Sequence, residues 1–236
     1  RRCGLASWPE SECAVLVIPF AFGGQDFAIL KEGAIFWPSQ SALIVADLHL
    51  EKASWFAMRG QMLPPYDSAA TLERLAKLIA QTRASDVWCL GDNFHDDDGA
   101  ERLSGAASAL LGRLTAETRW HWITGNHDEN LPDGVGGKIL PEAELEGIVL
   151  RHRADVLELQ PELSGHFHPK HRASARGQSV YRPCFVATAT KLILPAFGAL
   201  TGGLAADHPE IRAAVGEDAT ALLPAANRLL RFPLSI

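Results

Sequence analysis

Three short apolar runs in the first half of the chain each end in a cluster of aspartate, asparagine and histidine residues. The runs cover residues 42–46, 86–90 and 120–123, and helical patterns over residues 68–81 and 100–114 separate them. Strands that alternate with helices in this way predict a parallel or mixed β-sheet with helical crossovers. Because ligands gather at the carboxyl ends of such strands, we expect the three polar clusters to lie together at one edge of the sheet.

The second half of the chain is rich in short strand candidates and has few helical patterns. The candidates are residues 147–152, 162–168, 191–197 and 228–232. The two halves together predict an α/β fold, α+β by some schemes, in which two packed sheets have helices outside them. We expect one domain over residues 1–236, which includes an N-terminal hairpin at about 14–38 and C-terminal strands at about 178–236.

Composition and charge limit the possible partners. The chain is 47% hydrophobic and 21% charged, as is ordinary for a globular protein. Its net charge of −6 argues against binding a polyanion through bulk charge, but allows a local basic rim around an acidic centre. No apolar run approaches the roughly 18 residues of a membrane span, so we expect no membrane association and a cytoplasmic location. The widely spaced cysteines indicate reduced thiols: Cys3, Cys13, Cys89 and Cys184.

Two pairs of polar residues are each separated by a single residue. His166 and His168 lie in the stretch SGHFHPKHR, and Asp47 and His49 follow the first apolar run. In an extended strand, residues two apart face the same side. Each pair should therefore point into one space, and Phe167 should point the opposite way, into the core.

The candidate ligands mix carboxylate, amide and imidazole groups and include no thiolate. Asp92 follows the second apolar run and Asn126 follows the third. This mixture favours Mn²⁺, with Fe or Zn as alternatives. The candidates outnumber the ligands of one tetrahedral ion, so we expect two divalent ions, which can clamp a phosphoryl group between them. Asp92 is the central candidate to bridge the two ions.

Four ordered motifs resemble the calcineurin-like metallophosphoesterases. They are D-x-H from Asp47, GD-x-x-H from residue 91, GNHD from residue 125 and GHxH from residue 165. The resemblance implies a four-layer αββα sandwich that holds two metal ions. By motif, the ligands of the first ion would be Asp47, His49 and His168, those of the second would be Asn126, His152 and His166, and Asp92 would bridge. His152 has no local signature, but it follows an apolar run and so stands at a strand end.

The resemblance also implies a reaction and a narrower family. A metal-bridging hydroxide would attack phosphorus, and His127 would be the general acid that protonates the leaving group. His95 stands where the phosphoprotein phosphatases usually have aspartate. The same position is histidine in the double-strand-break repair nucleases, where it orients the catalytic histidine, and so favours a phosphodiesterase or nuclease.

Two further stretches narrow the resemblance. They are ADLHLEK at residues 46–52 and LPAFGALTGG at residues 194–203. Both resemble the bacterial DNA-ligase-associated metallophosphoesterases, which are assigned to DNA repair as endonucleases. The implied substrate is DNA, single-stranded or damaged, and the implied partners are a DNA ligase and helicase repair set.

Several residues have two interpretations that the sequence leaves open. Arg153, Lys170 and Arg172 could bind a phosphodiester backbone or form an ordinary charged surface. Trp55 and Phe56 could stack on a base or belong to the core.

The function also has alternatives. The chain could be a phosphomonoesterase that acts on a nucleotide or another small phosphate, or a metal-binding scaffold without catalysis. The short interval between His127 and His152 leaves little room for a cap domain and favours an open cleft for a polymer. The oligomeric state is not determined by the sequence.

Overall fold

The computed structural model describes residues 17–175, 178–216 and 218–234. The predicted thiols Cys3 and Cys13 lie outside these residues, whereas Cys89 and Cys184 are buried and free. Among the described residues, none of the helices has the length and apolar character needed to cross a bilayer. The expected single domain over the whole chain stays a prediction.

The first sheet contains the three apolar runs as adjacent parallel strands, as the sequence predicts. Its seven strands follow the order of the chain, β1 to β7, and the strands from β4 to β7 are parallel while β1 to β4 are antiparallel. The bounds are β1 Val17–Phe22, β2 Gln25–Leu30, β3 Ile35–Trp37, β4 Ala42–Val45, β5 Asp86–Leu90, β6 Arg119–Ile123 and β7 Lys138–Leu140. The polar clusters after β4, β5 and β6 therefore meet at one edge.

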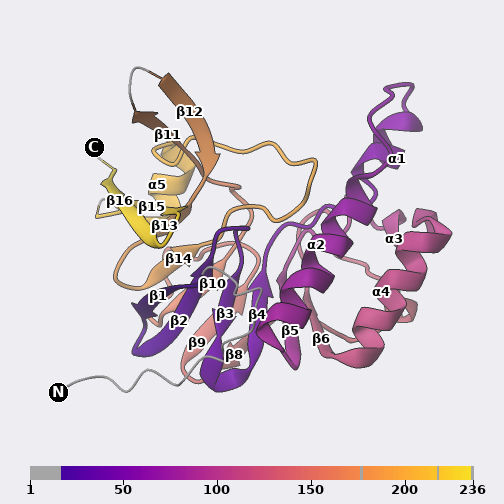
Figure 1. The fold of residues 1–236 in the computed structure, drawn as a ribbon, viewed down its shortest axis with the longest axis horizontal. Helices are drawn as coiled ribbons and strands as arrows, with labels where there is room; N and C mark the ends of the chain where they lie inside the picture. Colours follow the sequence, from indigo (N-terminus) through magenta and orange to yellow (C-terminus); the bar gives the residue numbers. More distant parts are fainter. Residues whose placement is uncertain (1–16, 176–177, 217, 235–236) are drawn as a thin grey trace.

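The second sheet is also mixed and has the order β16-β15-β13-β14-β10-β9-β8. Its bounds are β8 Glu142–Leu145, β9 Ile148–Arg151, β10 Glu162–Ser164, β13 Phe185–Ala187, β14 Lys191–Ile193, β15 Thr220–Ala225 and β16 Arg228–Pro233. Strands β9, β10 and β14 are parallel. Strands β11 (Lys170–Ala175) and β12 (Gln178–Pro183) form a separate two-stranded ribbon that projects from the second sheet (Figure 1).

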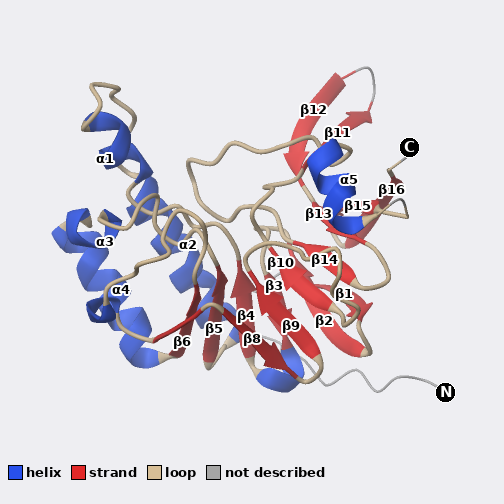
Figure 2. Ribbon diagram, turned by 180° about the vertical axis from the view of Figure 1, so that it is seen from behind, coloured by secondary structure: helices blue, strands red, loops and turns tan. Residues whose placement is uncertain are grey.

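Three apolar clusters show that the chain is built in four layers (Figure 2). Helices α2 (Asp67–Thr82) and α4 (Gly105–Glu117) pack on the first sheet through Leu72, Leu75, Leu111 and other buried residues. The facing sides of the two sheets form the second cluster. Helix α5 (Pro209–Val215) covers the far side of the second sheet. The order is helices, sheet, sheet, helix.

The helix expected over residues 100–114 is two helices. Helix α3 covers Gly99–Arg102, and α4 begins after Ser104, whose hydroxyl accepts a hydrogen bond from the Ala107 amide. Leu103 between them has an extended ψ of 124°. A serine N-cap starts a new helix whatever the apolar spacing around it. The regular spacing of the leucines therefore continues through the break and does not reveal it. The remaining helix, α1 (Lys52–Ala57), lies apart from the layers beside the first-sheet loops (Figure 1).

Candidate metal centre

The predicted ligands leave their strands before they reach the site. Strand β4 ends at Val45 and β10 ends at Ser164, so neither pair of ligands lies in an extended strand. Asp47, His49, His166 and His168 all have positive φ, between 44° and 73°. The extended backbone predicted for the two pairs was therefore wrong, although Asp47 and His49 still bring their donor atoms within 4.8 Å of each other. Each side chain is aimed by a left-handed turn, a conformation that costs free energy and that is concentrated at functional sites.

Backbone hydrogen bonds hold the strained loops in place. The Asp47 amide donates to the Gly91 carbonyl (3.2 Å), and the His49 amide donates to the Asp92 carbonyl (2.9 Å). The Leu50 and His95 amides continue this pairing beyond the ends of β4 and β5. The two loops are therefore one rigid unit, although neither is a regular strand.

One group of candidate ligands gathers around Asp47. The donor atoms of Asp47, His49, Asp92 and His168 all lie within 4.8 Å of one another. His49 Nε2 faces His168 Nε2 at 3.2 Å, and His168 Nε2 lies 3.4 Å from Asp47 Oδ1. Two imidazole nitrogens can point at each other only if a proton or a cation lies between them. The donor set therefore suits a divalent cation.

A second group adjoins the first and shares Asp92 with it. Asp92, His152 and His166 place donor atoms within 4.8 Å of one another. His166 Nδ1 lies 3.0 Å from His152 Nε2, which in turn lies 3.1 Å from Asn126 Oδ1. Asp92 presents Oδ2 to His49 at 3.6 Å and Oδ1 to His152 at 3.4 Å. One carboxylate thus faces both groups, and all seven predicted ligands converge.

The stretch SGHFHPKHR divides its two central histidines between the groups. His166 joins the group of His152, and His168 joins the group of Asp47. Phe167 between them is buried in the cluster under α5, as predicted. The His166 amide also donates to both carboxylate oxygens of Asp47, at 3.0 Å each. The loop after β10 therefore joins the second sheet to the first at the site.

Two glycines are required by close approach of other groups. A Cβ on Gly91, which has φ +77°, would lie 2.2 Å from His152 Nδ1. A Cβ on Gly125 would lie 2.2 Å from the Asp92 amide nitrogen. His152 Nδ1 also contacts the Leu90 carbonyl at 3.1 Å, which fixes the tautomer that leaves Nε2 for the site.

His127 is oriented by a backbone atom of His95. Its Nδ1 lies 3.0 Å from the His95 carbonyl oxygen, so this nitrogen carries the proton that it donates. His127 Nε2 then faces the centre, 4.0 Å from Asp92 Oδ2. The His95 ring stacks on the His127 ring at 5.0 Å, and its Nδ1 lies 3.3 Å from His49 Nδ1. His95, which the resemblance expects to orient His127, thus contacts it through both its carbonyl and its ring.

Asp128 supports the neighbouring loops from beneath. Its carboxylate is fully buried and accepts hydrogen bonds from the amides of Asn93 (2.7 Å), Phe94 (3.2 Å) and Gly125 (2.8 Å). Burial raises the pKa of Asp128, although these amide hydrogen bonds act to lower it. One side chain therefore joins the loop after β5 to the loop after β6.

Burial and crowding set the charge state of the site. Burial lowers the pKa of His166 to about 4, and the nearby His152 acts in the same direction. Burial also lowers the pKa of His95 to about 4 and that of His49 further. Burial raises the pKa of Asp92, helped by the Asp47 charge and opposed by His152. Neutral imidazoles are the form that binds a metal ion.

The predicted substrate residues differ in their surroundings. Arg153 is exposed, with its guanidinium 5.7 Å from the Phe167 ring, and it acts on the pKa of His166, so it lies near the second group. Lys170 donates from Nζ to the Thr201 carbonyl at 3.4 Å. Arg172 is exposed on the ribbon, 5.0 Å from the Tyr181 ring. Of the three, Arg153 alone is placed beside the predicted ligands by these contacts.

Three other histidines make structural contacts. His121 stacks on Trp88 at 3.9 Å, as expected for a histidine inside a strand. His171 stacks on Phe232 at 4.7 Å. His208 accepts a hydrogen bond from the Glu210 amide and caps α5.

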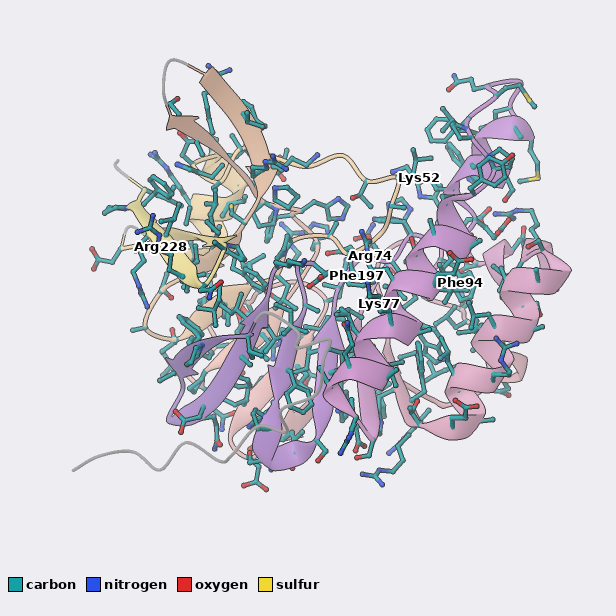
Figure 3. The ribbon with its side chains drawn as sticks, viewed as in Figure 1. Lys52, Arg74, Lys77, Phe94, Phe197 and Arg228 are labelled. Carbon is teal, nitrogen blue, oxygen red and sulfur yellow. The ribbon has the colours of Figure 1, made fainter. Side chains whose placement is uncertain are left out.

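The glycine-rich segment at residues 194–203 holds the Asp47 loop, which the sequence did not reveal. The Phe197 amide donates to the Ala46 carbonyl (2.8 Å), and the Gly198 amide donates to the Asp47 carbonyl (3.1 Å). Arg74 of α2 donates to the Phe197 carbonyl and lies over the Phe197 ring (Figure 3). Contacts across such a distance in the chain leave no local pattern.

Lys52 is a second residue that sequence reasoning missed. It opens α1, three residues after His49, and its charge lowers the pKa of His49 and His95. Burial lowers the pKa of Lys52 itself, while the carboxylates of Asp67 and Asp92 act to raise it. The stretch ADLHLEK contained Lys52, but the motif gave no chemical role to it.

Comparison with known proteins gives the family. The model of the calcineurin-like phosphoesterase family matches residues 41–183. One similar solved structure is the crystal structure of nuclease MPE from Pseudomonas putida. The two sequences are 30% identical, and the match covers 92% of this chain and 100% of that chain with a TM-score of 0.71. A protein of unknown function, AQ665 from Aquifex aeolicus, is 16% identical over 58% of this chain and 81% of its own, with a TM-score of 0.37. No curated protein matches.

The family match spans strands β4 to β12 and includes every residue of the two ligand groups. The layer order of two mixed sheets with helices outside is that of the metallophosphoesterase sandwich. The chain therefore belongs to the calcineurin-like phosphoesterase family and is a hydrolase of phosphoric esters.

Proposed function

We propose that this protein is a nuclease, a phosphodiesterase that cleaves DNA with two divalent metal ions. The observation that carries the proposal is the position of Asp92, whose two carboxylate oxygens face the two ligand groups. A shared carboxylate between two ions is the arrangement that stabilises both the attacking and the leaving oxygen of a phosphoryl transfer. A nucleic-acid substrate is supported by the nuclease from Pseudomonas putida, which aligns with 92% of the chain, and the choice of DNA rests on the family resemblance alone.

The proposed ligands of each ion are residues that contact one another in the structure. Asp47, His49 and His168 would hold the first ion; Asn126, His152 and His166 would hold the second; Asp92 would bridge. Mixed oxygen and nitrogen ligands without a thiolate suit Mn²⁺, with Fe or Zn as alternatives. When bound, the two ions supply an activated water and positive charge for the phosphate oxygens.

His127 is the proposed general acid. Its Nδ1 proton is held by the His95 carbonyl, so Nε2 is free to carry a second proton toward the site. As the bond between phosphorus and the leaving oxygen breaks, that proton moves from Nε2 to the oxygen. The side chain is 40% exposed, which lets it take up another proton from water. General acid catalysis of this kind contributes about 10²–10⁴-fold to a rate.

An open site favours a polymer over a small monoester. The interval between His127 and His152 contains only a short 3₁₀ turn (Asp133–Val135) and strands β7 to β9, which belong to the two sheets. It therefore adds no cap over the centre. Single-stranded or damaged DNA is the proposed form of the substrate, and a DNA ligase and helicase repair set are the proposed partners, on the resemblance alone. The cytoplasmic location stays a prediction.

The test compares mono- and diesters with the Mn²⁺-loaded protein. We expect faster hydrolysis of bis-p-nitrophenyl phosphate than of p-nitrophenyl phosphate, and cleavage of DNA oligonucleotides. His127→Ala should lower the diester rate by at least about 100-fold while the bound metal, measured by elemental analysis, is kept. Asp92→Asn should lose metal as well. The control is His208→Asn, which preserves the cap on α5.

Two results would contradict the proposal. Faster hydrolysis of the monoester, with no oligonucleotide cleavage, would make the protein a phosphomonoesterase. Absence of both bound metal and activity with Mn²⁺, Mg²⁺ and Zn²⁺ would make it a scaffold.

A further inference from the structure

Helix α1 and the turn that follows it carry two cations and two aromatic rings at helical spacing. Lys52, Trp55, Phe56 and Arg59 are separated by three, one and three residues, so they share one face. The Arg59 amide donates to the Phe56 carbonyl at 3.0 Å, which continues the turn past the end of the helix at Ala57. The four residues define what we call the α1 face.

The rings of the α1 face lie against His95, whose own ring stacks on the proposed acid His127. The Trp55 ring meets the His95 ring edge-on at 4.8 Å, and the Phe56 ring stacks on the same ring at 6.1 Å and 20°. His95 in turn stacks on His127 at 5.0 Å and 20°. A row of nearly parallel rings therefore runs from Phe56 through His95 to His127. Any group that stacks on the α1 face would lie next to the leaving-group side of the site.

Lys52 is a half-buried cation at the foot of the same helix (Figure 3). Within the part of the chain that the structure describes, its ammonium has no hydrogen bond or ion pair within contact distance, although the carboxylates of Asp67 and Asp92 act on it. A cation that has lost part of its water without gaining a partner is costly. An anion beside the metal centre would remove that cost, and the phosphate next to the cleaved one is such an anion.

The outer part of α1 and the turn after it expose apolar side chains. Met58, Met62 and Tyr66 are 60%, 84% and 72% exposed. Trp55 and Phe56 are partly buried and belong to none of the three core clusters. The Arg59 guanidinium lies 3.5 Å from the centre of the Trp55 ring, the cation–π arrangement that also accepts a stacked base.

We propose that the α1 face is a subsite for the nucleotide adjacent to the cleaved phosphodiester of single-stranded DNA. Lys52 binds the neighbouring phosphate, and Trp55, Phe56 and Arg59 stack on the base. The subsite requires an unpaired base, because a base inside a duplex has no face to offer. This inference rests on the proposed nuclease function and names the substrate form that the same site takes.

The stacking role of Trp55 and Phe56 is tested by comparing a normal DNA strand with a strand that lacks the bases beside the cleaved bond. The substrates are a single-stranded oligonucleotide and the same oligonucleotide with abasic residues on both sides of each cleaved bond. In the double variant Trp55→Leu/Phe56→Leu, apolar volume is kept and the rings are lost. We expect kcat/KM to fall about tenfold for the normal strand and to change less than about twofold for the abasic strand. Tyr181→Leu, an exposed ring on the ribbon, is the control.

Equal losses on the two strands would overturn the stacking role, because the rings would then act only by supporting His95. The comparison of strands keeps the test valid if the double variant is less stable, since instability lowers both rates alike. The melting temperature of each variant checks this directly.

The cationic half is tested with a matched pair of lysines. Lys52→Gln and Lys77→Gln remove the same charge, but Lys77 is exposed on α2 and is in neither ligand group. We expect Lys52→Gln to weaken oligonucleotide binding and to lower the salt dependence of log Kd by about 0.7, the value for one phosphate contact on a single strand. Lys77→Gln should change neither. Identical salt slopes for the two variants would overturn the role of Lys52.

Failure of the subsite and failure of the nuclease function give different results. If the wild-type protein hydrolyses only monoesters, the nuclease function is wrong. If the wild type cleaves the oligonucleotides, but the double variant loses activity equally on the two strands and both lysine variants behave alike, the nuclease function stands and the subsite is wrong.

Discussion

At the residue scale, the sequence identifies the candidate ligands but not the backbone conformation that orients them. Every residue of the two ligand groups stands in a motif or at the end of an apolar run, so residue type and order are enough to find it. The left-handed turns at Asp47 and His166, in contrast, could not be predicted from the sequence. These φ values exist because the loops are fixed by hydrogen bonds to other loops, such as the His166 amide on Asp47. Local spacing cannot contain such information.

Asp128 tests how much one buried carboxylate holds the site together. In Asp128→Asn, one oxygen becomes an amide nitrogen, which cannot accept from the amides of Asn93, Phe94 or Gly125. At least one buried donor then loses its partner. We expect the free energy of unfolding to fall by about 2 kcal/mol, measured by urea denaturation, and the diester rate to fall with it.

Asp26→Asn is the matched control, because Asp26 is exposed on β2. If the two variants differ by less than about 0.5 kcal/mol, Asp128 does not hold the loops.

At the scale of elements, the sequence predicts strands better than it predicts their ends. The three parallel strands and the hairpin of β2 and β3 appear where expected. The helix over residues 100–114 is broken, and β10 stops four residues short of the predicted end at His168. In both cases the apolar spacing continues past the end of the element. The helix is interrupted by the Ser104 cap, and β10 ends at a turn that contacts the distant Asp47 loop. The hydrogen bonds from the amides of residues 197 and 198 to the Asp47 loop could not be predicted either, because those residues lie far from the loop in the chain.

The contact between Gly198 and the Asp47 loop leaves no space for a side chain. A Cβ on Gly198 would lie 2.3 Å from the Leu48 carbonyl oxygen, so Gly198→Ala must displace backbone. We expect a loss of about 1–3 kcal/mol of stability and weaker binding of the first metal ion, measured by metal titration. Gly202→Ala in the same segment is the control, because nothing lies within 4 Å of its Cβ position. Equal metal affinity in the two variants would show that this segment does not position Asp47.

The amino ends of β5 and β6 are joined by a charged cluster whose effect depends on pH. Burial of Asp86 acts to raise its pKa, but hydrogen bonds from Arg119, Ser85 and His121 outweigh burial and lower the pKa below 3.8. A carboxyl group with a lowered pKa stabilises the fold above the pKa of the unfolded chain and loses this effect as pH falls through the folded value. Asp86→Asn should therefore be less stable than wild type at pH 7, and the difference should shrink below pH 3.8.

Thermal unfolding of the two proteins between pH 3 and pH 7 measures this difference. A difference that is constant over the whole range would mean that the cluster stabilises by packing alone.

At the scale of the whole molecule, the candidate metal centre lies where the two sheets meet. Asp47, His49 and Asp92 come from loops of the first sheet, while His152 and His166 come from the second. Apolar packing already joins the sheets over their facing sides. At one edge the His166 amide adds a second connection by donating to Asp47, and a bound cation would strengthen it by balancing the crowded donors. The pattern of the two halves predicts two packed sheets with helices outside, and the family resemblance implies the αββα sandwich, but nothing in the strand pattern states which faces of the sheets meet.

Bound metal should therefore stabilise the whole fold. A ligand at 100 times its dissociation constant stabilises the native state by about 2.7 kcal/mol, and a change of 1 kcal/mol moves the melting temperature of a chain of this size by about 2–4 °C. We expect removal of Mn²⁺ by a chelator to lower the melting temperature by about 5–10 °C for each ion lost, measured by calorimetry. Asp92→Asn, which removes the proposed bridge, should melt at nearly the same temperature with and without Mn²⁺. His208→Asn should keep the full difference. If the melting temperature of the wild-type protein is the same with and without Mn²⁺, both the metal site and its role in joining the sheets are contradicted.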